Sequence, residues 1–308
     1  MPAGAAPLRI ASRGSELALW QAEHVAALLR AADPDVAVEV VVVEVVADRR
    51  LDIPIWELGG KGAFAKEVQS AVLDGRADLA VHSGKDLPST PVPGLVLAAV
   101  PERGDVRDAL VGARLADLPP GARIGTGSAR RRVQLVDLRP DLTFGGLRGN
   151  MARRLERAAD FHAVVVAAVA LERLGLSDHI AEVLDESVLL PQVAQGALAV
   201  ECRDDDVATV ARLAAIEHGP SRRRVDAERG FLAELGGDCD LPAGAHARVL
   251  PDGRLRVDAL LASLDGRVVL RHRVDEEPGQ PDDDPAALGR AAARHLLDRA
   301  GGRALLDP

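Results

Sequence analysis

An aspartate and a lysine, Asp86 and Lys85, lie together in the segment H-S-G-K-D-L-P, directly after a short apolar stretch. A carboxylate in a cleft can act as a general acid or base or stabilise a developing cation, and neighbouring charges set its pKa. A turn-forming aspartate beside a surface lysine explains the spacing equally well. His82, which opens the segment, fits a structural histidine as well as a catalytic one.

Arginines are concentrated between residues 123 and 157, where nine arginines and three acidic residues leave an excess of +6 in a chain of formal net charge −9. Thr126, Gly127 and Ser128 precede most of them and supply hydroxyl groups at the N-terminus of an expected helix, a position that favours anions. Arginine forks hold carboxylates or phosphates in bidentate fashion. A solvated basic helix face is the alternative. The preceding hydroxyls favour an anion site without indicating which anion.

The two cysteines, Cys202 and Cys239, have no metal-ligand spacing, and we expect no metal site. Cys202 follows an apolar stretch, which predicts a thiol packed in the core. Cys239 lies in G-G-D-C-D-L-P, where the flanking Asp238 and Asp240 should raise the thiol pKa and disfavour an activated nucleophile. A cysteine in this setting is better suited to one lasting covalent bond than to repeated turnover.

Alternating strand and helix patterns must position these residues. A Val-rich run at 36–46 is typical of a strand buried on both faces of a parallel sheet. The polar segments after residues 8–11, 79–81 and Ile124 follow strands, and open α/β folds bind ligands at the carboxyl ends of strands. They are expected to converge on one cleft. The first 100 residues predict strands at 8–11, 36–46 and 79–81, a helix capped by Ser15 that ends near Pro34, and a helix from Phe64 that ends at Gly75.

The rest of the chain repeats this alternation and then changes. The order of elements predicts two open α/β domains and a small α+β C-terminal domain. We expect domain 1 at 1–100 with 197–216, domain 2 at 101–196 and domain 3 at 217–308. The later elements are strands around Ile124 and at 143–147 and 163–168, helices from Ser128 and Asn150, a helix through Leu235, strands at 245–250, 255–263 and 268–274, and a helix from Pro285.

Composition narrows the class of function. With 38 basic and 47 acidic residues, no Tyr, four Phe and two Trp, the chain is poorly suited to nucleic acid, to base stacking or to anionic membranes. It has no secretory signal pattern and no apolar run of membrane-spanning length, so we expect a cytoplasmic protein. The glycine-rich G-G-K-G at 59–62 lacks the Ser or Thr of a nucleotide P-loop and is better interpreted as a mobile lid.

Eight segments in order along the chain resemble the porphobilinogen deaminase family, from about Leu8 to the last helix. They are R-I-A-S-R-G-S-E-L-A-L-W-Q-A, G-G-K-G-A-F-A-K-E, A-V-H-S-G-K-D-L-P, E-R-G-D-V-R-D-A-L-V, G-T-G-S-A-R-R-R-V-Q-L, R-P-D-L-T-F-G-G-L-R-G-N, L-P-Q-V-A-Q-G-A-L-A-V-E-C-R and G-D-C-D-L-P-A-G-A-H-A.

The resemblance implies a transferase that condenses four porphobilinogen molecules head to tail, with release of ammonia, into the linear tetrapyrrole hydroxymethylbilane. It implies two domains like those of periplasmic binding proteins, with a cleft between them, a third small domain, and a monomer. It also implies a dipyrromethane cofactor bound through a thioether to Cys239.

The resemblance carries roles onto individual residues. Asp86 matches the catalytic carboxylate, which stabilises the cationic azafulvene left by the loss of ammonia. Lys61 and Phe64 match the lid. The residues that match contacts to cofactor or substrate are Arg13, Ser15, Ser83, Lys85, Thr126, Ser128, Arg130, Arg131, Arg148 and Arg154.

Three departures from the family pattern stand out. Asp238 replaces a common glycine before the cysteine, V-V-A-D at 45–48 replaces T-x-G-D, and Glu57 replaces a lysine of some members. Two rival functions remain testable. A binding module of the periplasmic type would need neither Asp86 nor Cys239, and a nucleic-acid binder would show salt-sensitive affinity without affinity for pyrroles.

Overall fold

The computed structural model describes residues 6–46, 62, 64–237, 241–278 and 284–306. These residues belong to two compact units, one formed by 1–103 with 197–222 and the other by 104–196 with 223–308. The division into three domains stays a prediction. Within the described ranges, no helix combines the length and the apolar character needed to cross a membrane.

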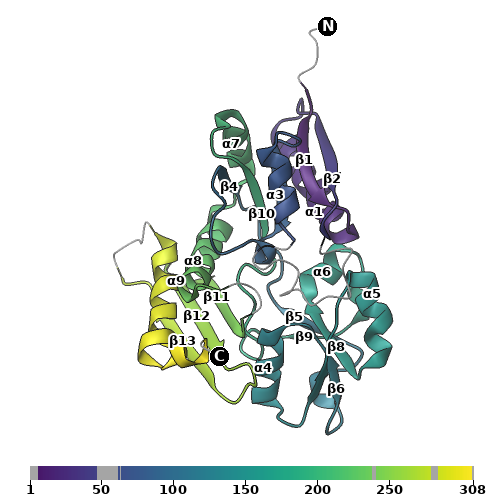
Figure 1. The fold of residues 1–308 in the computed structure, drawn as a ribbon, viewed down its shortest axis with the longest axis vertical. Coiled ribbons are helices and arrows are strands. Elements are labelled where there is room, and N and C mark those ends of the chain that lie inside the picture. The colour runs from purple at the N-terminus through teal and green to yellow at the C-terminus, as the bar shows by residue number, and fades with distance from the viewer. Residues whose placement is uncertain (1–5, 47–61, 63, 238–240, 279–283, 307–308) are drawn as a thin grey trace. The chain divides into compact units, whose positions relative to one another are not determined.

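The first unit is built on one mixed five-stranded sheet of order β2-β1-β3-β10-β4 (Figure 1). Strand β1 is parallel to both β2 and β3, and β10 is antiparallel to both β3 and β4. The antiparallel β10 was not expected from the sequence. The elements are β1 (Leu8–Arg13), α1 (Glu16–Ala32), β2 (Val38–Val43), α3 (Lys66–Leu73), β3 (Leu79–Ser83), β4 (Leu95–Ala99), β10 (Leu198–Arg203) and α7 (Val207–Leu213).

Local sequence explains where these helices begin and end. Ser15 has extended backbone and its hydroxyl accepts a hydrogen bond from the Ala18 N–H, which caps α1 as expected. Gly75, with φ of 70°, follows α3 and donates its N–H to the Val72 carbonyl, which confirms it as the stop of that helix.

The Val-rich strand β2 corrects one prediction. Burial on both faces was expected, but β2 is the edge strand of its sheet, and Val42 is 56% exposed. Valines favour β-structure at the edge of a sheet as well as at its centre. The run therefore predicted a strand but not the position of that strand in the sheet.

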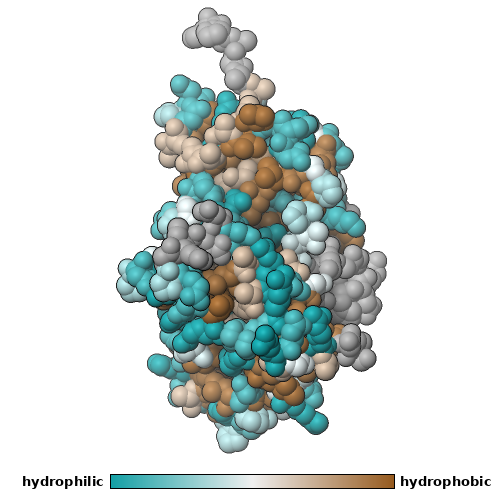
Figure 2. All heavy atoms as spheres, turned by 90° about the vertical axis from the view of Figure 1, so that its left-hand side faces the viewer, coloured by the Kyte–Doolittle hydropathy of each residue, from teal (hydrophilic) through white to brown (hydrophobic). Residues whose placement is uncertain are grey.

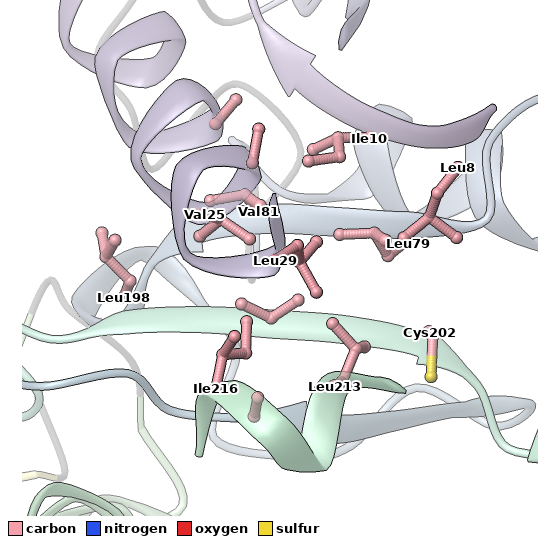
Figure 3. Close-up of a cluster of buried hydrophobic side chains, with 14 residues drawn as sticks. Leu8, Ile10, Val25, Leu29, Leu79, Val81, Leu198, Cys202, Leu213 and Ile216 are labelled. Carbon is pink, nitrogen blue, oxygen red and sulfur yellow. The ribbon is translucent and has the colours of Figure 1, made fainter. Parts of the chain in front are cut away.

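Side chains from α1, the central strands and the helix after β10 form the main core of the first unit (Figure 3). Cys202 on β10 is fully buried in it, as predicted. The core residues labelled in Figure 3 are Leu8, Ile10, Val25, Leu29, Leu79, Val81, Leu198, Cys202, Leu213 and Ile216.

The second unit contains another mixed five-stranded sheet, of order β7-β6-β8-β5-β9 (Figure 1). Strands β7, β6 and β8 are parallel, and β5 is antiparallel to both β8 and β9. Its elements are β5 (Asp108–Val111), β6 (Arg123–Gly125), α4 (Ala129–Leu138), β7 (Thr143–Gly145), α5 (Met151–Glu156), β8 (Ala163–Ala167), α6 (Ala168–Arg173) and β9 (Ile180–Leu184).

A separate antiparallel sheet of order β11-β12-β13 lies in the same unit, together with α9 and with α8 from Arg223 onward. The two helices meet at glycines: a Cβ on Gly289 would lie 1.8 Å from the Ala227 carbonyl oxygen, and one on Gly230 would lie 2.2 Å from that of Ala286. The predicted fold class, two open α/β sheets and a small C-terminal α+β part, is confirmed. The elements are α8 (Gly219–Leu235), β11 (Ala243–Val249), β12 (Leu255–Ala262), β13 (Val269–Asp275) and α9 (Pro285–Arg294).

The surface on the face drawn in Figure 2 shows hydrophobic residues in separate patches among hydrophilic ones. Such a mixture is ordinary for protein surfaces, because apolar atoms supply more than half of the accessible area even in well-folded proteins.

Candidate active site

The carboxyl ends of β1 and β3 bring Arg13 and Asp86 together in the first unit. The two strands are parallel neighbours, Arg13 is the last residue of β1, and Asp86 closes the short turn that follows β3. Arg13 Nη1 lies 3.9 Å from Asp86 Oδ2, with 21% and 28% of the two side chains exposed. The first two polar segments therefore converge as expected, and both charged groups remain accessible.

An aromatic ring also lies against the arginine. The Arg13 guanidinium carbon lies 4.3 Å from the centre of the Phe64 ring, a cation–π distance. Gly62 packs against Pro88, because a Cβ on this glycine would lie 2.8 Å from Pro88 Cγ. Gly62 and Phe64 thus lie near the Asp86 turn, and their role as part of a lid stays a prediction. Lys61, the other predicted lid residue, lies outside the described residues.

Ser83 has a partner that the sequence interpretation missed. Gln21 Nε2 donates a 2.8 Å hydrogen bond to Ser83 Oγ, and Gln21 is only 3% exposed. A polar residue among the buried positions of α1, next to Ala22, was the signal available in the sequence. Two further predicted site residues of this unit, Ser15 and Lys85, lie in different environments. Ser15 caps α1, and Lys85 is half-buried in the turn before Asp86.

His82 is a buried side chain with structural partners. Its Nε2 lies 3.2 Å from Glu201 Oε2 on β10, and Gln69 Nε2 on α3 donates a 2.8 Å hydrogen bond to the same oxygen. The three side chains tie β3, β10 and α3 together inside the unit. Of the two interpretations left open by the sequence, the structural one fits this environment.

In the second unit, the turn after β6 uses its own hydroxyl groups. Ser128 Oγ accepts from the Arg131 N–H and caps α4, while Thr126 Oγ1 accepts from the Ser128 N–H at 3.2 Å. Gly127 packs against the Leu147 carbonyl oxygen, which would lie 2.9 Å from a Cβ. The turn therefore lies beside the end of β7, where Arg148 follows.

The arginines of this unit divide into two groups. Arg148 and Arg154 are half-buried, and Arg154 Nε donates to the Gly149 carbonyl at 2.9 Å. Arg130 and Arg131, by contrast, are 2% and 6% exposed. They belong neither to a solvated basic helix face nor to an open anion site as the structure stands.

Asp108, the first residue of β5, pairs with both buried arginines. Its Oδ2 accepts from Arg130 Nη2 at 2.8 Å, and its Oδ1 accepts from Arg131 Nη2 at 2.7 Å. Burial alone would raise the pKa of Asp108, but the two guanidinium charges outweigh burial and hold that pKa well below its usual range. The only sequence signal for this partner was an acid at the start of the apolar stretch D-A-L-V.

Cys239 lies outside the described residues, whereas both ends of its segment are described. Leu241 occupies the space beside Gly237, since a Cβ on this glycine would lie 2.0 Å from Leu241 Cδ1. The other cysteine, Cys202, is enclosed in the core, and its burial, together with nearby acidic residues, raises the pKa of its thiol to about 11. Cys202 is thus unsuited to forming a thioether at neutral pH.

Comparison with known proteins gives one consistent result. Residues 8–211 match the family model "Porphobilinogen deaminase, dipyromethane cofactor binding domain", and residues 222–298 match "Porphobilinogen deaminase, C-terminal domain". The porphobilinogen deaminase of Nitratidesulfovibrio vulgaris is 44% identical over 305 residues, covering 97% of this chain and 96% of the relative. That of Roseiflexus castenholzii is 46% identical over 304 residues, covering 97% and 98%.

Among solved structures, a TRAP periplasmic solute binding protein from Desulfovibrio salexigens is similar over 67% of this chain and 70% of its own. The two share 12% identical residues, with a TM-score of 0.40.

Proposed function

The chain belongs to the porphobilinogen deaminase family, and we propose that it joins four porphobilinogen molecules head to tail, releasing ammonia at each step, to form hydroxymethylbilane. Membership establishes the coarser function: the chain is a transferase of tetrapyrrole synthesis that polymerises porphobilinogen and has a dipyrromethane-binding domain. The observation that best supports the finer proposal is the accessible Asp86 carboxylate, held beside Arg13 at the ends of two parallel strands.

In the proposed reaction, the Asp86 carboxylate stabilises the positive charge that develops when the substrate loses ammonia. Loss of ammonia from porphobilinogen leaves a cationic azafulvene, and a carboxylate near the pyrrole N–H groups stabilises that cation and assists proton transfers. Arg13 lies within 4 Å of Asp86 and is held against Phe64, so it can bind a substrate carboxylate while Asp86 faces the pyrrole. The arrangement separates anion binding from cation stabilisation on adjacent side chains.

Binding of the growing chain needs several cations, because every porphobilinogen unit brings an acetate and a propionate. Arg13 ends β1, Arg148 follows β7 and Arg154 lies on α5. All three are half-buried, so bidentate pairing with carboxylates costs little reorganisation. Ser15, Ser83, Lys85, Thr126 and Ser128 are proposed to make the lesser polar contacts. Ser15, Thr126 and Ser128 each also accept a hydrogen bond from a nearby backbone N–H. Ser83 accepts one from the side chain of Gln21 on α1.

Dipyrromethane fits the buried arginines of the second unit. Arg130 and Arg131 bring two positive charges against the single carboxylate of Asp108, and Arg130 Nε is a buried donor without a hydrogen-bond partner among the described residues. A carboxylate of the cofactor would supply the missing acceptor. We propose that the cofactor is tethered through a thioether to Cys239, and when bound it supplies the pyrrole carbon to which the first substrate is joined.

The tether is tested by intact mass. The protein, expressed in cells that make porphobilinogen, is expected to carry extra mass equal to two linked pyrrole units and to colour with an aldehyde reagent for pyrroles. Cys239→Ala should lose both signals because the thioether cannot form. The matched control is Cys202→Ala, which removes the buried thiol and should keep the extra mass. An unmodified wild-type chain, or modification that persists in Cys239→Ala, would contradict the proposal.

The role of Asp86 is tested by removing its charge. Asp86→Asn should retain the fold and the covalent cofactor, yet lose at least about a hundredfold in kcat, since acid–base and electrostatic groups typically contribute that much or more. Asp74→Asn, which neutralises an exposed aspartate of the same unit, should leave the rate unchanged. Steady-state product formation measures both variants, and near-normal turnover by Asp86→Asn would exclude it as the catalytic carboxylate.

A monomer acting in the cytoplasm remains the prediction for the state of the enzyme. Gel filtration of the loaded protein and cell fractionation measure it directly.

A further inference from the structure

Asp108 holds a charged cluster that has no access to water. Its side chain is fully buried, Arg130 and Arg131 are nearly so, and Gln195 Nε2 donates to Asp108 Oδ1 at 3.0 Å. Oδ1 alone accepts three hydrogen bonds, from Arg131 Nε, Arg131 Nη2 and Gln195 Nε2. A carboxylate with this many donors is locked in one orientation, and the groups that it contacts are locked with it.

The two arginines are held differently. Each nitrogen of the Arg131 guanidinium has an acceptor, Nε and Nη2 on Asp108 and Nη1 on the Val165 carbonyl oxygen at 3.0 Å. Arg130 is held only at the end of its fork, by Asp108 and by the Leu190 carbonyl oxygen at 2.5 Å from Nη1. Its Nε is left as a buried donor with no acceptor among the described residues.

The strand that follows the cysteine in sequence packs against the aliphatic part of Arg130. A Cβ on Gly244, the second residue of β11, would lie 3.1 Å from Arg130 Cδ, the carbon that bears Nε. Because Asp108 and the Leu190 carbonyl hold the two terminal nitrogens of Arg130, Nε is the nitrogen of this guanidinium that has no acceptor among the described residues. The cluster is also one negative charge short, with two cations and one anion buried together.

We propose that Asp108 is a positioning residue for cofactor acquisition: it fixes Arg131 as a support and aims the Nε edge of Arg130 at a carboxylate of dipyrromethane. This inference rests on the proposed function. The proposed role requires more than a negative charge at this position. In Asp108→Glu the carboxylate is displaced by one methylene, so the charge is preserved but Arg130 is no longer held in the same orientation. The proposed role is also distinct from a general contribution to stability.

The experiment measures how fast apoprotein acquires the cofactor. Full-length protein is produced without porphobilinogen, porphobilinogen is then added, and intact mass follows the gain of two pyrrole units at a temperature well below each variant's Tm. Asp108→Glu is compared with wild type and with two controls. Asp105→Asn removes an aspartate that pairs with the exposed Arg107, and Leu110→Ala weakens the core from a buried position of the same strand.

Asp108→Glu is expected to acquire the cofactor at least about tenfold more slowly than Leu110→Ala, even where both are equally folded by circular dichroism. Asp105→Asn should load at the wild-type rate. The melting temperature should rise on loading in wild type and in both controls, and by clearly less in Asp108→Glu.

Equal loading rates for Asp108→Glu and Leu110→Ala would overturn the positioning role while leaving the proposed function intact. If Asp108→Glu does not fold, Arg131→Lys takes its place, since lysine keeps the charge but cannot fork onto Asp108, and the same slowing is expected. Failure of wild type to acquire the cofactor would overturn both the inference and the proposed function.

Discussion

At the scale of single residues, Arg13 shows how one cation can be fixed by two unlike neighbours. The Phe64 ring lies against one side of its guanidinium, and the Asp86 carboxylate lies within 4 Å of Nη1. The aromatic contact adds attraction without taking up hydrogen-bond donors, because a ring face accepts a cation through its quadrupole. The ring therefore adds to the attraction that holds Arg13 without competing for its N–H groups.

Replacing the ring tests this arrangement. Phe64→Leu keeps a similar apolar volume but removes the cation–π contact, typically about 0.5–2 kcal/mol, so we expect KM for porphobilinogen to rise roughly 2- to 30-fold with a smaller change in kcat. The control is Phe161→Leu, whose ring also contacts arginines, Arg123 and Arg157, in the other unit. Steady-state kinetics with unchanged KM in Phe64→Leu, or an equal rise in the control, would speak against a role for the ring.

The sequence predicted which residues are chemically important better than it predicted their partners. Asp86 and Arg13 stood out through their segments, and the structure brings them together. Asp108 and Gln21 did not, because a buried polar residue looks like any interruption of an apolar pattern until its partner is known. Arg130 and Arg131 appeared as part of a charge run, and only the folded strand order shows that they face a carboxylate 22 and 23 residues away.

At the scale of elements, α8 and α9 cross with their backbones in contact. Gly230 and Gly289 provide the space, and a methyl group on either would overlap main-chain atoms of the other helix. Main chain cannot rotate away as a side chain can, so any larger residue must separate the helices.

Gly289→Ala is therefore expected to destabilise the second unit by about 2–4 kcal/mol, although alanine is the better helix former by about 1 kcal/mol. Gly219→Ala, at the first residue of α8, where a Cβ meets nothing within 4 Å, should be neutral or slightly stabilising. Denaturant unfolding followed by circular dichroism compares the two. A stable Gly289→Ala would mean that the helices can separate without cost.

Most helices and strands could be predicted from hydrophobic periodicity and from residues that begin or end helices, since caps such as Ser15, Ser128 and Asn150 act locally. The antiparallel strands β5 and β10 could not. Their short apolar sequences resemble any buried strand, and their direction is set by where the chain re-enters each sheet. For the same reason, the sequence could not show that β2 is an edge strand.

At the scale of the whole molecule, a chain of net charge −9 keeps a patch of positive charge away from water. Asp108 is the group that couples this patch to the stability of the protein. Its pKa in the folded state lies below its unfolded value of about 3.9, because Arg130 and Arg131 favour the ionised form. Its contribution to stability is therefore fully present above about pH 5 and is lost as the pH falls from about 4 toward the folded pKa.

The low pKa of Asp108 predicts how the stability of the Asp108→Asn variant, relative to wild type, changes with pH. The variant should be less stable than wild type at pH 7 by about 3–5 kcal/mol, the usual cost of leaving a buried charge unpaired. The gap in free energy of unfolding should narrow as the pH falls below about 4, since wild type then loses the same carboxylate. Urea unfolding at several pH values between 3 and 7 gives the gap, and a constant value over this range would contradict the assignment.

The buried thiol of Cys202 has a practical consequence. With its pKa raised to about 11, roughly one molecule in a thousand carries the thiolate at pH 8, and the core shields even that fraction from reagents. Removing Cys202 is therefore unnecessary before a spectroscopic probe is attached. If Cys239 carries the proposed thioether, a maleimide dye directed to a cysteine introduced on the surface would report on a single known position, and fluorescence could follow the enzyme through its successive additions without interference from Cys202.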